Sequence, residues 1–138
     1  MPAVTFYVVA DTAASAQLTV ACRIAEKAWK AGSTVLIQHA DRDELARLDA
    51  MLWTTGNDQG FIPHEVATEP PRLAGIPVVL NTGTGPTEAV DVLINLTLQL
   101  PTRPELASRI IEIIDADRAL VAGHCLMYER YRGGVKNP

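Results

Sequence analysis

The chain has 138 residues, of which 48% are hydrophobic and 20% are charged, and its formal net charge is −4. This length fits one domain with a packed core, and the composition excludes disorder over most of the chain. The acidic balance argues against a general nucleic-acid binder, since such proteins present basic surfaces to phosphate groups.

The sequence also argues against a membrane or secreted protein. No apolar run reaches the ~18 residues of a membrane span, and the first residues lack the basic region of a signal peptide. Cys22 and Cys125 lie far apart without metal-ligand spacing, as expected for buried thiols in a reducing compartment. We therefore expect a cytoplasmic protein.

The chain begins with a predicted strand and helix. Residues 4–10 (VTFYVVA) are β-branched and aromatic, which predicts a buried strand. Residues 15–32 place apolar side chains on one helical face. Ser15 is the expected N-cap of this helix, and Gly32 stands where a glycine commonly ends one.

A second strand and helix follow. Residues 33–40 (STVLIQHA) predict a strand, and residues 41–53 predict a helix with a leucine stripe. Asp41 is its expected N-cap, with Glu44 at the third helical position. This alternation predicts a pair of parallel strands with a right-handed crossover.

The second half is less regular. Residues 61–67 (FIPHEVA) form a short apolar piece that Pro63 interrupts. Further strands are predicted in three places: residues 76–80, 90–98 and 109–114. The first two of these have no full helix between them, so a non-parallel strand or an unusual crossover is expected there. A last helix, capped by Asp115 or Asp117, is predicted to run to about Arg132.

Together these elements predict an α/β fold: a single three-layer α/β/α domain over residues 1–138, with a mostly parallel, Rossmann-like sheet of about five strands. The last ~5 residues are expected to be loose, as chain ends commonly are.

The loop NTGTGPTEAV (residues 81–90) is a weak candidate for phosphate binding. A Walker loop needs a Lys and a following helix, and a dinucleotide fingerprint needs a third glycine. Here Glu88 takes the place of that glycine, Pro86 removes one N–H donor, and the next residues predict a strand. The loop is therefore interpreted as a connector.

Two acidic residues follow predicted strands at the edge where open α/β sheets place their active sites. Asp11 and Asp41 could hold a metal for phosphotransfer, but a turn into the first helix and a helix N-cap are the better explanation of the two residues. His39, His64 and His124 are scattered and match no metal or nucleophile pattern. We expect no metal or cofactor, and the metal- or nucleotide-dependent enzyme stands as the alternative function.

Two other groups suggest protein partners. Trp53, Phe61, Pro63 and His64 place large aromatics beside a proline, which is typical of an anchor for a partner or of a cluster that packs a loop. The segment from Tyr128 to Arg132 combines aromatic faces with guanidinium groups, which suits a peptide carboxylate. From Arg118 onward four cations oppose Glu129 alone, a net charge of +3 against −7 for residues 1–117.

These segments resemble the chi subunit family of bacterial DNA polymerase III. The most specific pieces are LDAMLW and F-x-P-H. The resemblance is carried by TFYVVAD, AEKAWKAGSTVLIQHADRDELARLDAMLWT, FIPHEVA, GIPVVLNTG, DVLINL, RIIEIID and YERYRGG.

The resemblance implies a subunit without catalytic activity, which links the clamp loader, through the psi subunit, to the acidic C-terminal peptide of single-stranded DNA-binding protein during DNA replication. It implies that the region of Trp53, Phe61, Pro63 and His64 binds psi, or a helicase in its place. It implies no strong direct binding to nucleic acid. The implied peptide site comprises Ile114, Arg118, Tyr128, Arg130, Tyr131 and Arg132.

The chain departs from the family at that peptide site. Val121, Cys125 and Glu129 stand where the family carries basic residues. Either nearby cations such as Lys136 replace them, or the peptide binds weakly, or the partner differs.

Overall fold

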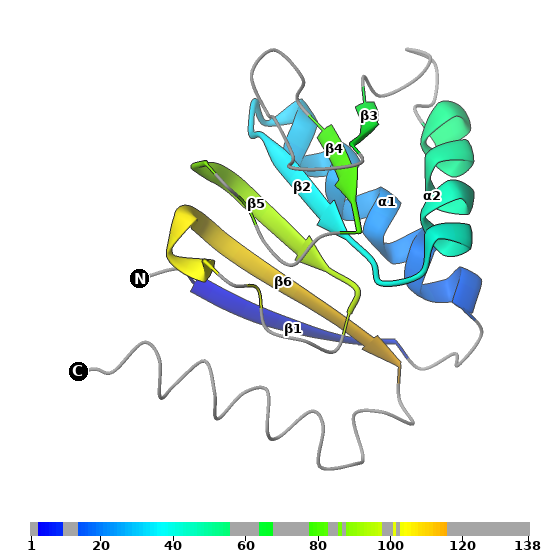
Figure 1. Cartoon of the computed structure of the whole chain (residues 1–138), viewed down its shortest axis with the longest axis horizontal. Helices are drawn as coiled ribbons and strands as arrows, with labels where there is room; N and C mark the ends of the chain where they lie inside the picture. The colour runs from blue at the N-terminus through cyan, green and yellow to red at the C-terminus, as the bar shows by residue number, and fades with distance from the viewer. Residues whose placement is uncertain are drawn as a thin grey trace.

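The structure is a computed structural model of the whole chain (Figure 1). It describes residues 3–9, 14–55, 64–67, 78–82, 86, 88–97, 101 and 103–115. The elements in these ranges are β1 (Ala3–Val9), α1 (Ala14–Lys30), β2 (Val35–Gln38), α2 (Arg42–Thr55), β3 (His64–Ala67), β4 (Val78–Asn81), β5 (Val90–Asn95), the 3₁₀ helix η1 (Pro104–Leu106) and β6 (Ala107–Asp115).

The strands within these ranges form one six-stranded sheet in the order β1-β6-β5-β2-β4-β3, which Figure 1 shows from bottom to top. Every neighbouring pair is parallel. The predicted α/β class is therefore confirmed, and the sheet has one strand more than expected. The additional strand is β3, which pairs with β4 and which the sequence presented only as a short apolar piece.

The unusual crossover that the sequence suggested lies between β4 and β5. Both strands pair with β2, one on each side, so the chain passes across β2 between Asn81 and Val90. None of the described residues in this connection, 82, 86, 88 and 89, is helical. The sequence also allowed a non-parallel strand here. Among the described strands there is none, and β2 pairs in parallel with β4 on one edge and with β5 on the other.

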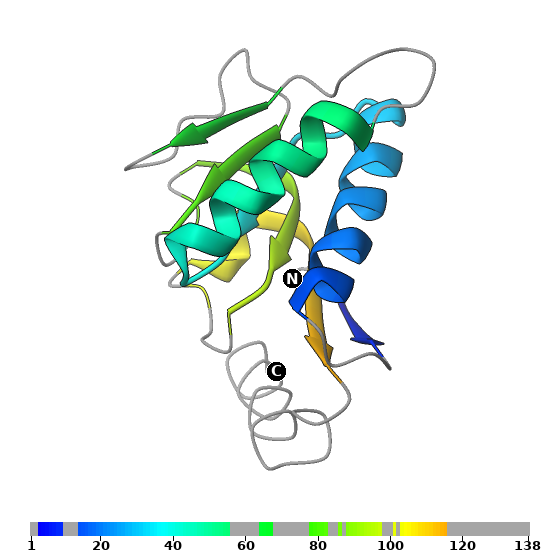
Figure 2. The same cartoon turned by 90° about the vertical axis from the view of Figure 1, so that its right-hand side faces the viewer.

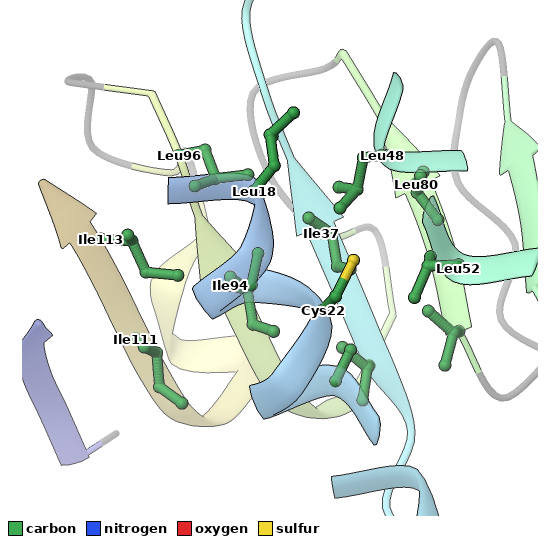
Figure 3. Close-up of a cluster of buried hydrophobic side chains, with 14 of the residues drawn as sticks. Leu18, Cys22, Ile37, Leu48, Leu52, Leu80, Ile94, Leu96, Ile111 and Ile113 are labelled. Carbon is green, nitrogen blue, oxygen red and sulfur yellow. The ribbon is translucent and has the colours of Figure 1, made fainter. Parts of the chain in front are cut away.

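Both described helices lie on the same face of the sheet (Figure 2). Their buried side chains, such as Leu18 and Leu48, meet alternate residues of the central strands, such as Ile37 and Ile94 (Figure 3). Cys22 is only 2% exposed within this cluster, so the prediction of a buried apolar thiol is confirmed for this residue. The third layer predicted for the other face depends on residues about 117–132, which lie outside the described residues.

The other face of the sheet carries a second apolar cluster. Leu36, Val79, Leu93 and Ile110 belong to it, and Phe6 packs against it. Because side chains alternate between the two faces of a strand, these residues are the immediate neighbours of those that face the helices. Burial on both faces explains why the central strands have nearly continuous apolar sequences.

The end of α1 follows the prediction closely. Gly32 has φ of 87°, the left-handed conformation that favours glycine. Its N–H donates to the carbonyl of Trp29 at 2.9 Å, and the N–H of Ser33 donates to the carbonyl of Ala28 at 3.0 Å. These two bonds form a Schellman motif. At the other end α1 begins at Ala14, so Ser15 lies inside the helix and its prediction as N-cap is wrong.

β1 differs from the buried strand that its sequence predicts. It lies at one end of the sheet, and Ala3, Thr5 and Tyr7 are exposed. The reason is the path of the chain, since α1 carries it past two strand positions to β2, and β5 and β6 later fill the space between. An apolar sequence alone does not distinguish an edge strand from a central one.

Neither α1 nor α2 has the length and hydropathy that would let it cross a bilayer.

Candidate partner-binding surfaces

Trp53 is the most exposed large apolar side chain among the described residues. It lies near the end of α2 and is 53% exposed. Its neighbour Leu52 is fully buried, because consecutive helical residues point about 100° apart. Ala46 and Ala50 precede Trp53 on the exposed side of α2 at helical spacing. Small side chains there leave the indole accessible to a partner.

The rest of the predicted aromatic group is only partly described. His64 is the first residue of β3, the strand at the end of the sheet opposite β1. α2 packs against β3 and β4, so Trp53 and His64 belong to the same end of the fold. Phe61 and Pro63 lie outside the described residues.

Of the residues predicted to form the peptide site, Ile114 is the one that the structure describes. It lies on β6, in register with Val8 of β1, and is 2% exposed. Ile111 and Ile113 face the helices, whereas Ile110 faces the second apolar cluster, so Ile114 shares the face of Ile110. Outside the described residues lie the other members of the site: Arg118, Tyr128, Arg130, Tyr131 and Arg132.

Trp53 and Ile114 thus mark two separate regions. Trp53 belongs to a helix on one face, over the β3–β4 end of the sheet. Ile114 belongs to the opposite face, on the strand next to β1. The structure therefore does not bring Trp53 and Ile114 together.

Asp41 acts as the N-cap of α2, as predicted. Its Oδ1 accepts hydrogen bonds from the N–H of Asp43 at 2.8 Å and of Glu44 at 3.4 Å. Its own N–H donates to Nδ1 of His39 at 3.0 Å, so Glu44 does not complete a reciprocal capping box at that N–H. His39 therefore has a local structural role, and its Nδ1 is an acceptor in this arrangement.

The described residues do not support a metal centre. They contain no group of three or more His, Cys, Asp or Glu side chains positioned to hold an ion. Asp11 and His124 lie outside the described residues, and the side chain of His64 is not described. The 81–90 loop leads directly into β5 rather than into a helix, which agrees with its interpretation as a connector.

The sequence reading missed a row of buried polar side chains across the sheet. Gln38, Asn81, Asn95 and Glu112 are each at most 2% exposed. Asn81 on β4, Gln38 on β2, Asn95 on β5 and Glu112 on β6 are neighbours in register. All four lie on the face of the sheet away from the helices. The signal was present in the sequence, because each apolar run contains one polar residue, at the end of VLIQ, VVLN and VLIN and at the centre of IIEII.

This polar row lies near the carboxyl ends of the strands, the edge where open α/β sheets bind ligands. Its near-complete burial leaves it inaccessible as a binding surface. The row instead links neighbouring strands, as the hydrogen bond of 2.9 Å from Asn95 Nδ2 to Glu112 Oε2 shows.

Comparisons with known proteins agree with the resemblance in the sequence. The family model described as DNA polymerase III chi subunit, HolC, matches residues 1–134. A Pseudomonas aeruginosa protein named DNA polymerase III subunit chi is 41% identical over 120 residues, covering 87% of this chain and 82% of the relative. A Haemophilus influenzae protein of the same name is 25% identical over 115 residues, covering 83% and 79%.

The family match extends over nearly the whole chain, and it includes the strands and helices of the parallel sheet as well as Trp53 and the basic C-terminal segment. The family is defined as a subunit of a DNA polymerase, and chi is an accessory rather than a catalytic subunit. The chain belongs to the DNA polymerase III chi subunit family.

Proposed function

We propose that this protein is an adaptor of the replicative polymerase that joins two partners through two separate surfaces. One surface, around Trp53, Phe61, Pro63 and His64, binds the psi subunit of the clamp loader or a helicase. The other, built on Ile114 and the basic C-terminal segment, binds the acidic C-terminal peptide of single-stranded DNA-binding protein. The protein acts in the cytoplasm as a single domain without a cofactor.

The observation that carries this proposal is the separation of Trp53 from Ile114. An adaptor must hold both partners at once, and these residues lie on opposite faces and toward opposite ends of the sheet. An enzyme would instead be expected to gather its reactive groups in one place. Asp41, the described member of the alternative metal pair, uses its carboxylate to cap α2.

The peptide surface is expected to work through charge. Guanidinium groups bind a terminal carboxylate with paired hydrogen bonds, and tyrosine rings can form the walls around an apolar neighbour. Removing one such Arg should cost about 1.5–3 kcal/mol of binding free energy, the range for charge-assisted hydrogen bonds. The affinity should also fall as salt rises, since exposed charges are screened.

The test measures binding of a fluorescent acidic peptide that ends in Phe, with three variants in parallel. Tyr128→Ala combined with Arg132→Ala should abolish peptide binding, whereas Trp53→Ala should leave it unchanged. Arg109→Ala is the matched control, because Arg109 is an exposed cation on β6 that the proposal leaves outside the site. Equal losses of peptide affinity for Arg109→Ala and for the double variant would mean that the peptide responds only to net charge.

Co-purification from the native host identifies the other partner. The wild-type chain should retain psi or a helicase, and Trp53→Ala should lose that same protein while still binding the peptide. Loss of both activities in Trp53→Ala would contradict two independent surfaces. Retention of every partner by this variant would show that the indole is not the anchor.

A further inference from the structure

α1 differs in charge from the other described helices and strands. It has three cations, Arg23, Lys27 and Lys30, and one carboxylate, Glu26, which gives it a net charge of +2. With His counted as neutral, every other described helix or strand is neutral or negative. The whole chain has a net charge of −4, so α1 forms a local basic surface on an acidic protein. A surface of this kind attracts an anionic partner.

The three cations lie along one stripe of α1. Their spacing of i, i+4 and i+7 places them on the same side of the helix, roughly opposite the core-facing Leu18 and Ala25. All three are exposed to solvent. Because helical residues rise by about 1.5 Å each, the stripe extends over about 10 Å of the helix axis.

Two of these cations have no carboxylate partner among the described residues. Lys30 Nζ contacts Glu26 Oε2 at 3.2 Å, whereas Arg23 and Lys27 form no ion pair in this part of the chain. The helix dipole explains a basic residue at Lys27 and at Lys30, which lie in the last turn. It does not explain Arg23, because the dipole effect is confined to that turn. Arg23 and Lys27 are therefore available to a partner.

We propose that this stripe binds an acidic peptide segment of a partner protein in an extended conformation. In an extended chain alternate residues lie roughly 6–7 Å apart. This distance is close to the rise of about 6 Å between Arg23 and Lys27 along the helix. Two carboxylates at alternate positions of the peptide can therefore reach both cations at once, with charge-assisted hydrogen bonds.

The surroundings of the stripe favour a peptide over a nucleic acid. Proteins that bind single strands stack the bases on exposed aromatic side chains. Among the described residues the exposed large apolar side chains are Tyr7 and Trp53, and neither belongs to α1. Trp29 of α1 packs against the core cluster instead. The net charge of −4 also opposes the many phosphates of a long strand.

The stripe is separate from the peptide surface of the adaptor proposal. α1 covers one face of the sheet, and Ile114 lies on the other. A stripe of cations recognises side-chain carboxylates and needs no free carboxyl terminus. The partner sequence is therefore an internal acidic segment, and its binding does not depend on Tyr128 or Arg132.

Fluorescence anisotropy of the full chain at low salt tests the proposal, with a labelled peptide of alternating Glu and Gly that is amidated at its C-terminus. Arg23→Gln combined with Lys27→Gln should raise the dissociation constant at least ~3-fold, because two exposed ion pairs are lost. Arg42→Gln combined with Arg103→Gln is the matched control, since it removes two charges from exposed positions outside α1. This control should leave the dissociation constant unchanged.

The wild-type chain gives two further measurements. Its dissociation constant should rise with salt, since exposed charges are screened. In nuclear magnetic resonance spectra, the peptide should shift the amides of residues 19–30 more than those of the other elements.

Four results would overturn the proposal. One is the absence of peptide binding at low salt, and another is an equal loss of affinity in the two glutamine pairs. A third is loss of binding in Tyr128→Ala combined with Arg132→Ala, which would place the peptide at the C-terminal segment. The fourth is tighter binding of a thymidine oligonucleotide of the same charge, with the same shifted amides, which would make the stripe a nucleic-acid surface.

Discussion

The side-chain amide of Asn95 donates a hydrogen bond of 2.9 Å to Oε2 of Glu112, between two neighbouring strands and with both residues only 1% exposed. The carbonyl of the same amide accepts from the N–H and the hydroxyl of Thr97, at 3.0 and 2.9 Å. Asn95 therefore uses both ends of its amide, which determines the orientation of its side chain. This arrangement joins β5, β6 and the turn after β5.

Replacing Asn95 should destabilise the fold. Asn95→Ala removes one partner from Glu112 and one from Thr97, and we expect a loss of about 1–3 kcal/mol in the free energy of unfolding. Asn95→Asp keeps the acceptor for Thr97 but places a second carboxyl group against Glu112, so it should cost at least as much. Urea unfolding measures the stability of both variants. If Asn95→Asp leaves the free energy of unfolding unchanged, the amide donor is unimportant.

The cap of α2 gives a second prediction. Asp41→Ala removes the acceptor for two helical N–H groups and should cost about 0.5–2 kcal/mol in stability. Asp41→Asn should lose much less, since its side-chain oxygen can still accept. Thermal unfolding with and without magnesium separates the cap from the metal alternative. A large stabilisation of wild type by the metal, absent in Asp41→Asn, would contradict the purely structural role.

Gly32 tests whether backbone conformation alone determines which residue a position tolerates. A Cβ at Gly32 would meet no atom within 4 Å, so side-chain crowding is not a factor. Its φ of 87° is nevertheless unfavourable for residues with a side chain, and Gly32→Ala should cost about 1–2 kcal/mol. Gly32→Asn should cost less, because asparagine tolerates this conformation better. Equal losses for the two variants, measured by urea unfolding, would contradict a conformational origin.

Trp53 and Leu52 form a matched pair on α2 with opposite environments. Leu52 is 0% exposed, and Leu52→Ala should cost about 2–5 kcal/mol as a buried side chain is removed. Trp53→Ala should change stability by no more than about 0.5 kcal/mol, as is usual at exposed positions. Calorimetry of the two variants measures this difference. A severe loss of stability in Trp53→Ala would mean that the indole packs the fold and does not primarily serve a partner.

Thr34 and Asp91 connect the beginnings of β2 and β5. Oδ2 of Asp91 accepts from the N–H of Thr34 at 2.8 Å and from its hydroxyl at 3.2 Å, and the N–H of Asp91 donates back to that hydroxyl at 3.0 Å. A double-mutant cycle with Thr34→Val and Asp91→Ala should give a coupling of about 0.5–3 kcal/mol. Additive losses in urea unfolding would show that the two residues act independently.

Much of the local structure followed from the sequence. The Asp41 cap and the glycine at the end of α1 were predicted correctly, because both depend on backbone groups within a few residues. The strands β2, β4, β5 and β6 were recognised from their β-branched apolar runs. The four-residue strand β3 was missed, since a short strand after a proline has little signal of its own and is stabilised by pairing with β4.

The sequence by itself determined the family, the alternation of helices and strands, and the residue types available for binding partners. Only the tertiary structure decided that β1 is an edge, that Trp53 and Ile114 lie on opposite faces, and that four polar residues align in one buried row. The physical reason is that strand order and register depend on contacts between segments far apart in the chain. An apolar run has the same local preference for extended structure whether it lies at the edge of the sheet or at its centre.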